Sequence, residues 1–283
     1  MSQDLFAESA RLGVLLGALE IPWEGLAGVV AAFPEEVPRY TEFSVSDSDA
    51  ALGVMVKGEG QDFTHRVAHF MERNSVPQER LKRLLATAKH FEHINLFFKV
   101  EADRSGILEM SWYFRRRPSV DVALDFLKAD GIDDAAFVRD IAQRLGKGTV
   151  HFVGGSEGRS GSGNKLYFSQ PDSPGAWARL RAVAAHTGVG AEWGRLEANA
   201  GGLQGLFSFL SIGWADGVRV PGFKLDVHGL TGLTLGRIVR GAPNEALQRI
   251  HLLLSLHDKE QVDYAGFRLS PGQPLTTKVY AAR

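Results

Sequence analysis

The feature that most constrains this 283-residue chain is a hairpin-and-helix unit that recurs along most of its length. Pairs of short runs rich in β-branched and aromatic residues alternate with amphipathic helical stretches. Turn-like segments such as "DRSG" at 103–106 join the two runs of a pair. Successive pairs are centred about 50 residues apart, enough for one hairpin and one helical return. The recurrence predicts one architecture built from equivalent units.

Five hairpins are predicted, which gives ten antiparallel strands. Their strands are expected at 40–46 with 51–57, 93–102 with 107–116, 148–154 with 164–170, 206–214 with 222–229, and 261–270 with 275–282. The segment "GGSEGRSGSGN" is expected to be the tip of the third hairpin, and "SDSD" at 46–49 the turn of the first. The stretch from about 190 to 203 has no clear pattern.

No linker or low-complexity segment divides the chain. We therefore expect a single domain over 1–283, with N-terminal helices over 1–35 and barrel repeats over 36–283. The N-terminal part is expected to be a helix pair that breaks at Ile21-Pro22. Helical stretches after each of the first four hairpins are expected to cover the apolar face of the strands.

Ten such strands could form an open sheet, two sheets or a closed barrel. Closure is favoured because it removes exposed edges and gives each hairpin an equivalent place. The predicted fold class is therefore α+β, a ten-stranded antiparallel β-barrel of five hairpins surrounded by α-helices. In this arrangement the apolar residues Leu166 and Phe168 face the helices, and Lys165 and Tyr167 face inward.

The polar strand face combines tyrosines with cations. All five tyrosines lie on predicted strands, and a Lys or Arg stands two residues from Tyr113, Tyr167 and Tyr280. On an open sheet these would be ordinary solvated residues. In a barrel the cations of four hairpins would converge, and a converging cluster needs an anion because unpaired inward charges are costly. Phosphate or diphosphate is the natural ligand of such a cluster.

Composition excludes several functional classes. A net charge of −1 argues against global attraction to nucleic acid or an anionic membrane, so any basic patch must be local. The absence of cysteine rules out disulfides and thiolate sites. Glu20, Pro22 and Glu24 interrupt the most apolar stretch, so no membrane span is expected. No secretory signal is visible, and a cytoplasmic monomer is the default expectation.

Three familiar motifs are approached but not met. "GRSGSGNKL" lacks the P-loop pattern because Leu166 stands where Ser or Thr is required. His65 and His69 in "HRVAH" lack the Glu and the third ligand of a zinc site. "IDDAAFVRD" has Phe137 where an isoprenoid-synthase DDxxD motif has its last Asp. A surface or structural interpretation is favoured for each.

With "NKLYF" and the closing "DYAGFRLSPGQPLTTKVYAA", the five hairpin units make the chain resemble the ABBA prenyltransferases, aromatic prenyltransferases with a ten-stranded barrel (PT barrel). The resemblance implies that the allylic diphosphate is bound by Lys99, Arg115, Lys165, Lys224, Arg268 and Lys278. It also implies that the allylic cation is shielded by Tyr113, Tyr167, Tyr264 and Tyr280.

The activity implied by this resemblance is electrophilic aromatic substitution on an aromatic small molecule or a peptide side chain. Glu42 is the candidate catalytic base or acceptor anchor, with Glu101 and Glu109 as alternatives. Some members use Mg²⁺ through an acid near the first hairpin. The strand "LGVMVK" has no acid, so no metal site and no required cofactor are expected, although Mg²⁺ is left open.

Two other functions remain open. One is a non-catalytic barrel that binds an anionic or aromatic ligand, and the other is a structural protein whose polar sheet face meets water. The chain stops soon after its last predicted strand, without a helix to cap the barrel. In the family an open end goes with larger acceptors, including peptides, but the N-terminal helices could cover the same opening.

Overall fold

The computed structural model describes residues 3–47, 51–91, 95–169, 175–199, 207–231, 235–236, 244–258 and 261–282. The turn predicted at 46–49 and the strand ends predicted at 93–94, 170 and 206 fall wholly or partly outside these residues. The barrel strands are β1 (Thr41–Ser46), β2 (Leu52–Glu59), β3 (Asn95–Asp103), β4 (Gly106–Arg115), β5 (Phe152–Gly158), β6 (Gly161–Ser169), β7 (Phe207–Ala215), β9 (Phe223–Thr231), β10 (Gln261–Leu269) and β11 (Thr276–Ala282).

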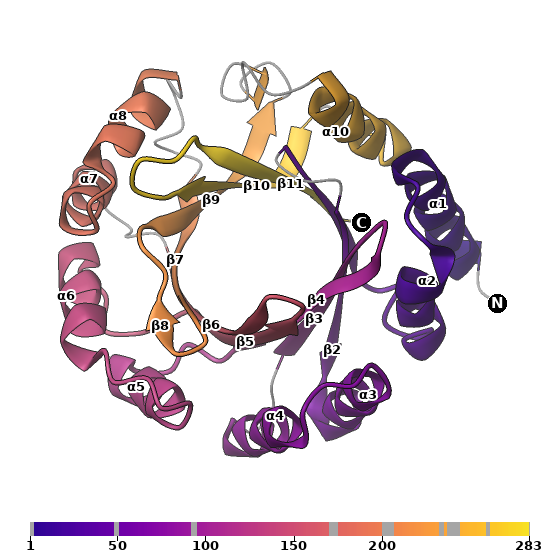
Figure 1. The fold of residues 1–283 in the computed structure, drawn as a ribbon, viewed down its shortest axis with the longest axis horizontal. Helices are drawn as coiled ribbons and strands as arrows, with labels where there is room; N and C mark the ends of the chain where they lie inside the picture. Colours follow the sequence, from indigo (N-terminus) through magenta and orange to yellow (C-terminus); the bar gives the residue numbers. More distant parts are fainter. Residues whose placement is uncertain are drawn as a thin grey trace.

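These strands form a closed antiparallel ring, which confirms the predicted ten-stranded barrel (Figure 1). Neighbours in the sequence pair around most of the ring. Pairing of β6 with β7 joins the two halves, and pairing of β1 with β11 closes the circle, with Ser44 opposite Tyr280. The two-residue strand β8 (Val218–Arg219) adds to β7 outside the ring.

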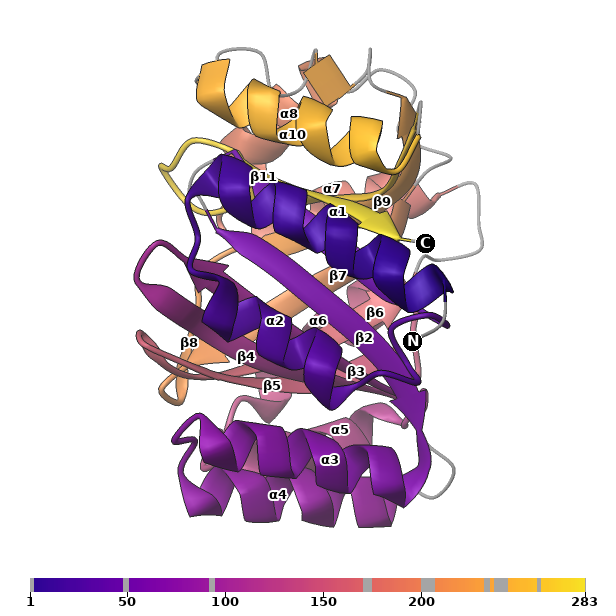
Figure 2. The ribbon, with the colours of Figure 1, turned by 90° about the vertical axis from the view of Figure 1, so that its right-hand side faces the viewer.

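Helices surround the barrel wall (Figures 1 and 2). They are α1 (Gln3–Leu19), α2 (Trp23–Ala32), α3 (Gly60–Arg73), α4 (Gln78–His90), α5 (Val120–Lys128), α6 (Ala135–Leu145), α7 (Ala176–His186), α8 (Gly190–Asn199) and α10 (Asn244–Leu256). Helix α8 lies in the stretch for which the sequence has no clear pattern. Within the described ranges, no helix has the length and apolarity needed to cross a bilayer.

The N-terminal helix pair is present as predicted, with Pro22 directly before α2. Pro22 lacks a backbone N–H and so cannot continue α1. Helix α1 packs between α2 and α10 in the outer ring, alongside the strands rather than across the lumen (Figures 1 and 2). These helices therefore do not cover a barrel opening, which the sequence had left open as an alternative.

The main hydrophobic core lies between the barrel wall and the helices. The outward-facing side chains of Phe98, Leu166 and Phe168 are completely buried there. This confirms the predicted alternation, because their sequence neighbours Lys99, Lys165 and Tyr167 line the interior. Two-residue periodicity thus separates an apolar outer face from a polar inner face.

The tip of the third hairpin lies within "GGSEGRSGSGN" as predicted, but it is much shorter than this segment. Most of the segment is strand, because β5 continues to Gly158 and β6 begins at Gly161. The glycines are needed for packing: a Cβ at Gly155 would lie 2.4 Å from the Trp112 ring, and one at Gly154 would lie 2.6 Å from the Tyr113 ring. Aromatic side chains of β4 therefore occupy the space that larger residues on β5 would fill.

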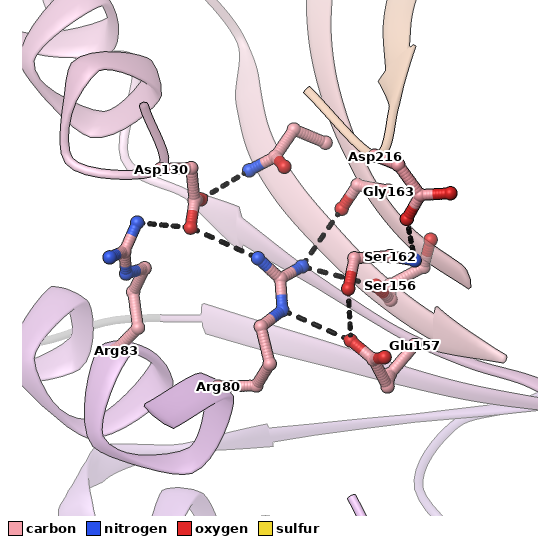
Figure 3. A network of polar contacts seen from close by, with 9 residues as sticks. Arg80, Arg83, Asp130, Ser156, Glu157, Ser162, Gly163 and Asp216 are labelled. Atoms are coloured by element: carbon pink, nitrogen blue, oxygen red, sulfur yellow. Dashed lines mark hydrogen bonds and ion pairs between the residues drawn. The ribbon is translucent and has the colours of Figure 1, made fainter. Parts of the chain in front are cut away.

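One polar network interrupts the apolar outer face (Figure 3). Arg80 of α4 forms ion pairs with Asp130 at 3.0 Å and Glu157 at 3.1 Å. It also donates to the backbone carbonyls of Ser156 and Gly163, both at 3.1 Å. The network ties α4 to hairpin β5–β6, and so fixes the position of β6, the strand that carries Lys165 and Tyr167.

Candidate active site

The inward-facing side chains line two adjoining cavities within the barrel. One, the cationic half, has a volume of about 370 Å³ and is lined by most of the predicted cations. The other, the aromatic half, has a volume of about 310 Å³ and is lined largely by aromatic rings. The side chains that line both cavities form a belt between them: Lys99, Tyr113, Tyr167, Lys224 and Tyr280.

Most of the predicted diphosphate-binding residues converge. The cationic half is lined by Lys99, Lys165, Lys224, Arg268 and Lys278, which come from four different hairpins. Arg115 does not join them. It lies at the end of β4, is exposed and lines the aromatic half. The reason is its register, since Arg115 pairs with Asn95, four residues along β3 from Lys99.

The protein's own carboxylates already pair with the lysines. Glu101 forms ion pairs with Lys99 and, at 2.6 Å, with Lys278. Burial would raise the pKa of Glu101, but these two lysines outweigh it and hold the pKa well below its usual range. Glu101 is therefore a charged counter-ion and a poor proton acceptor, which argues against the sequence-based alternative that made it the base.

Two further acids complete the pairing. Asp226 lies 2.6 Å from Lys224, and Glu109 lies 3.7 Å from Lys165. Nearby Glu109 raises the pKa of Lys165, and burial would lower it. The convergence of cations thus agrees with the expectation for a barrel, but their demand for an anion is met in part from within the chain.

Glycines on adjacent strands let two lysines lie against the barrel wall. A Cβ at Gly266 would lie 2.2 Å from the Cε of Lys224. A Cβ at Gly53 would lie 2.7 Å from the Cε of Lys99. Any other residue at either glycine would displace a lysine from its present position, so these glycines shape the cationic half.

The tyrosines of the belt are held by one another and by lysines. Tyr113 and Tyr167 meet edge to face, with ring centroids 5.6 Å apart and planes at 90°. Lys224 donates a hydrogen bond of 2.8 Å to the hydroxyl of Tyr280, and its ammonium lies 4.9 Å from the centre of that ring. Lys99 lies 5.1 Å from the same ring. Burial raises the pKa of Tyr167 and of Tyr280, so both remain neutral donors.

Tyr264, the fourth predicted shield, lies apart from the belt. It lines the aromatic half, with its ring centroid 6.4 Å from that of Phe209. Glu42 lines the same half and is only 4% exposed. The hydroxyl of Tyr40 donates to Glu42 at 3.1 Å. Burial raises the pKa of Glu42 to about 7, although Lys99 and the Tyr40 hydrogen bond oppose the rise.

Sequence reasoning missed several residues that line the aromatic half, namely Phe97, His151, Phe152 and Phe209. Phe97 and Phe152 meet edge to face at 5.6 Å. The sequence did contain a signal for Phe97, because this residue is two positions from Lys99 on β3 and therefore lies on the same face of the strand. His151 directly precedes β5, and only the three-dimensional structure shows that it faces the cavity.

The arrangement can hold an anion in one half and an aromatic ring in the other, with tyrosines between them. Among the described residues, no group of three or more His, Asp or Glu side chains is placed to hold a metal ion. Metal independence stays a prediction.

Comparison with known proteins identifies the fold. No family model and no curated protein matches the chain. Among solved structures, 6-dimethylallyl tryptophan synthase aligns over 99% of this chain and 96% of its own, with a TM-score of 0.71 and 14% identity. AnaPT from Neosartorya fischeri aligns over 99% and 94%, with a TM-score of 0.66 and 12% identity.

A third solved structure that aligns with this chain is a ligand complex. It is 5-dimethylallyl tryptophan synthase from Streptomyces coelicolor in complex with DMASPP and Trp, which aligns over 99% of this chain and 95% of its own, with a TM-score of 0.61 and 14% identity. The fold of the present chain is therefore that of the ABBA-type aromatic prenyltransferases, the PT barrel. At these identities the likeness establishes the fold, and the activity is argued from the site.

Proposed function

We propose that this protein transfers an allylic prenyl group from its diphosphate to an aromatic acceptor by electrophilic aromatic substitution. One observation supports this most strongly: cations from four hairpins meet in a cavity that adjoins an aromatic one across a tyrosine belt. The shared fold adds support, because a structure of similar fold is a complex with DMASPP and Trp.

The diphosphate binds in the cationic half. Five cations line or border it against the three carboxylates Glu101, Glu109 and Asp226, which leaves an excess of two positive charges (5 − 3). Diphosphate oxygens accept charge-assisted hydrogen bonds from the lysines and compete with the carboxylates for them. The cations also stabilise the negative charge that grows on the leaving diphosphate as the allylic C–O bond breaks.

The belt tyrosines stabilise and isolate the allylic cation. Their electron-rich faces attract positive charge, and their rings exclude the water that would quench it. Lys224, bonded to the hydroxyl of Tyr280, places a diphosphate-binding cation directly beside this shield.

The acceptor ring occupies the aromatic half. Glu42 accepts a hydrogen bond from an N–H or O–H of the acceptor and so orients the ring toward the belt. A pKa of about 7 suits Glu42 to receive a proton when the alkylated ring regains aromaticity. The acceptor class is therefore an indole, a phenol or a peptide side chain of that kind.

A second candidate is a barrel that binds an anionic or aromatic ligand without catalysis. It is favoured by the ion pairs of Lys99, Lys224 and Lys278, which satisfy the cations without a substrate. The two candidates share ligand binding and differ in turnover.

The deciding experiment incubates the full chain with dimethylallyl diphosphate and a panel of indoles and phenols, and looks for prenylated product by mass spectrometry. Calorimetric titration with inorganic pyrophosphate measures binding separately. Lys165→Ala and Lys278→Ala are expected to weaken pyrophosphate binding substantially, while Lys82→Ala, at an exposed site on α4, leaves it unchanged. Binding without product would favour the second candidate. Unchanged pyrophosphate affinity in both lumen variants would exclude the cationic half as the diphosphate site.

A further inference from the structure

His151 is a buried polar side chain that has no partner in the protein. It is 5% exposed and lines the aromatic half. Neither Nδ1 nor Nε2 has a hydrogen-bond partner among the described residues. Its backbone N–H donates to the carbonyl of Tyr167 at 2.6 Å, which fixes the residue directly before β5. The ring is therefore held at the cavity wall by the backbone, and both nitrogens are buried without a hydrogen bond.

The neighbours of the imidazole are aromatic. Its ring centroid lies 4.5 Å from that of Phe152 and 4.8 Å from that of Phe209. These rings pack against it but cannot satisfy its nitrogens. Leaving a buried polar group without a hydrogen bond costs free energy of folding, so a phenyl ring here would favour folding more. An imidazole at such a position indicates that its hydrogen-bond partner belongs to a bound ligand.

The imidazole is neutral at ordinary pH. Burial lowers its pKa to about 4, and the positive charges of Arg115, Arg117 and Lys147 act in the same direction. A neutral imidazole has one donor and one acceptor nitrogen, which complements an amide or a hydroxyl group.

His151 and Glu42 lie on separate walls of the aromatic half. Going round the ring of ten strands, β5, which His151 directly precedes, is four positions from β1, which carries Glu42. The rings of Phe97, Phe152 and Phe209 line the same cavity. The aromatic half therefore offers hydrogen-bonding side chains on two separate walls of an aromatic cavity.

We propose that His151 binds a second, uncharged polar group of the acceptor, and so selects aromatic compounds that carry an amide or hydroxyl beyond the ring donor held by Glu42. This rests on the proposed acceptor site but not on turnover. Two rivals exist: the imidazole fills space only, or the second group is a carboxylate held by Arg115, which lines the same cavity.

The test measures acceptor affinity by calorimetry on the full chain without any prenyl donor. Three probes are compared: indole, N-acetyl-L-tryptophanamide and N-acetyl-L-tryptophan. The wild type should prefer the amide to indole. His151→Phe, which keeps the ring shape, should reduce that preference about tenfold and leave indole binding unchanged. His151→Asn, which keeps a donor and an acceptor, should restore part of it, and His65→Ala on the exposed face of α3 should change nothing.

Three results would overturn the proposal: no preference for the amide in the wild type, an unchanged preference in His151→Phe, or equal weakening of both probes. Tighter binding of N-acetyl-L-tryptophan than of the amide would support the carboxylate rival instead. If His151→Phe does not fold, ¹⁵N imidazole spectra of the wild type decide, because the His151 nitrogens should shift with the amide probe and not with indole. Missing prenyl transfer with an intact amide preference would reject the proposed reaction alone.

Discussion

The two halves of the lumen are built on opposite principles. In the cationic half the four lysines pair with carboxylates of the chain before any ligand arrives, as in the contacts of Glu101 with Lys99 and Lys278. In the aromatic half, among the described residues, both nitrogens of His151 lack a hydrogen bond, and Glu42 accepts one from Tyr40. The difference indicates that the first half is organised around ion pairs and the second around receiving a molecule that brings its own hydrogen bonds.

The largest expected effect is at Lys224, which belongs to both halves. Lys224→Ala removes a cation at the belt and leaves the buried Asp226 without its partner at 2.6 Å. Pyrophosphate affinity and kcat/KM for dimethylallyl diphosphate should each fall about 100-fold. Calorimetry and steady-state kinetics measure this, with Lys82→Ala as the matched control. If only the affinity for the acceptor fell, the assignment of diphosphate binding to the cationic half and of acceptor binding to the aromatic half would be wrong.

Glu42→Gln should affect the acceptor side alone. We expect kcat to fall about 100-fold, with pyrophosphate affinity unchanged, because the proton acceptor is lost and the cations are not. In the wild type the rate should rise with pH through about 7, where Glu42 loses its proton. That limb of the pH–rate profile should vanish in the variant. Persistence of the limb would assign it to another group.

The raised pKa of Glu42 also predicts how the free energy of unfolding depends on pH. The folded pKa of Glu42 is about 7, above its ordinary value of 4.5, so the folded protein binds more protons between these values. The free energy of unfolding should therefore fall as pH rises from 4.5 to 7, and Glu42→Gln should flatten that slope. Urea titrations at several pH values measure it. An equal slope in both proteins would contradict the raised pKa.

Gly266→Ala tests whether the cationic half depends on a glycine. The new Cβ would meet the Cε of Lys224 at 2.2 Å and push the lysine away from the wall. Pyrophosphate affinity should fall about tenfold while indole affinity stays the same. Gly194→Ala in α8 is the control, because nothing lies within 4 Å of its added Cβ. Equal effects of both substitutions would remove the special role of Gly266.

The smallest expected effect is at Glu101. Glu101→Gln removes a negative charge from beside Lys99 and Lys278, and pyrophosphate affinity should rise about threefold. Titrations at two salt concentrations should show a steeper salt dependence than in the wild type. Weaker pyrophosphate binding in this variant would mean that Glu101 is needed to position the lysines.

Much of the fold was predictable because two-residue alternation is a local property. It placed Lys165 and Tyr167 inside and Leu166 and Phe168 outside without any knowledge of distant strands. The closure of the barrel followed from the number of hairpins and the cost of exposed edges. The strand glycines at 154–155 misled the prediction, because the rings that they accommodate come from another strand.

The partners within the site could not be predicted in the same way. Which acid meets which lysine depends on register and on distances across the ring, as for Lys278 of β11 and Glu101 of β3. For the same reason, the sequence could not show that Arg115 lies apart from the other cations or that His151 faces the cavity. Alternation gives the face of a side chain, but its height along the barrel axis comes only from the strand pairing.

Pairing of β1 with β11 also has a consequence for synthesis of the protein. Residues 41–46 pair with residues 276–282, so the ring cannot close until the long segment between them has been synthesised and has left the ribosome. Until then the edges of β1 and β10 are open to other strands, and Lys278 is absent from the lumen. Strand β11 thus closes the barrel wall and brings Lys278 to Glu101 in the same step.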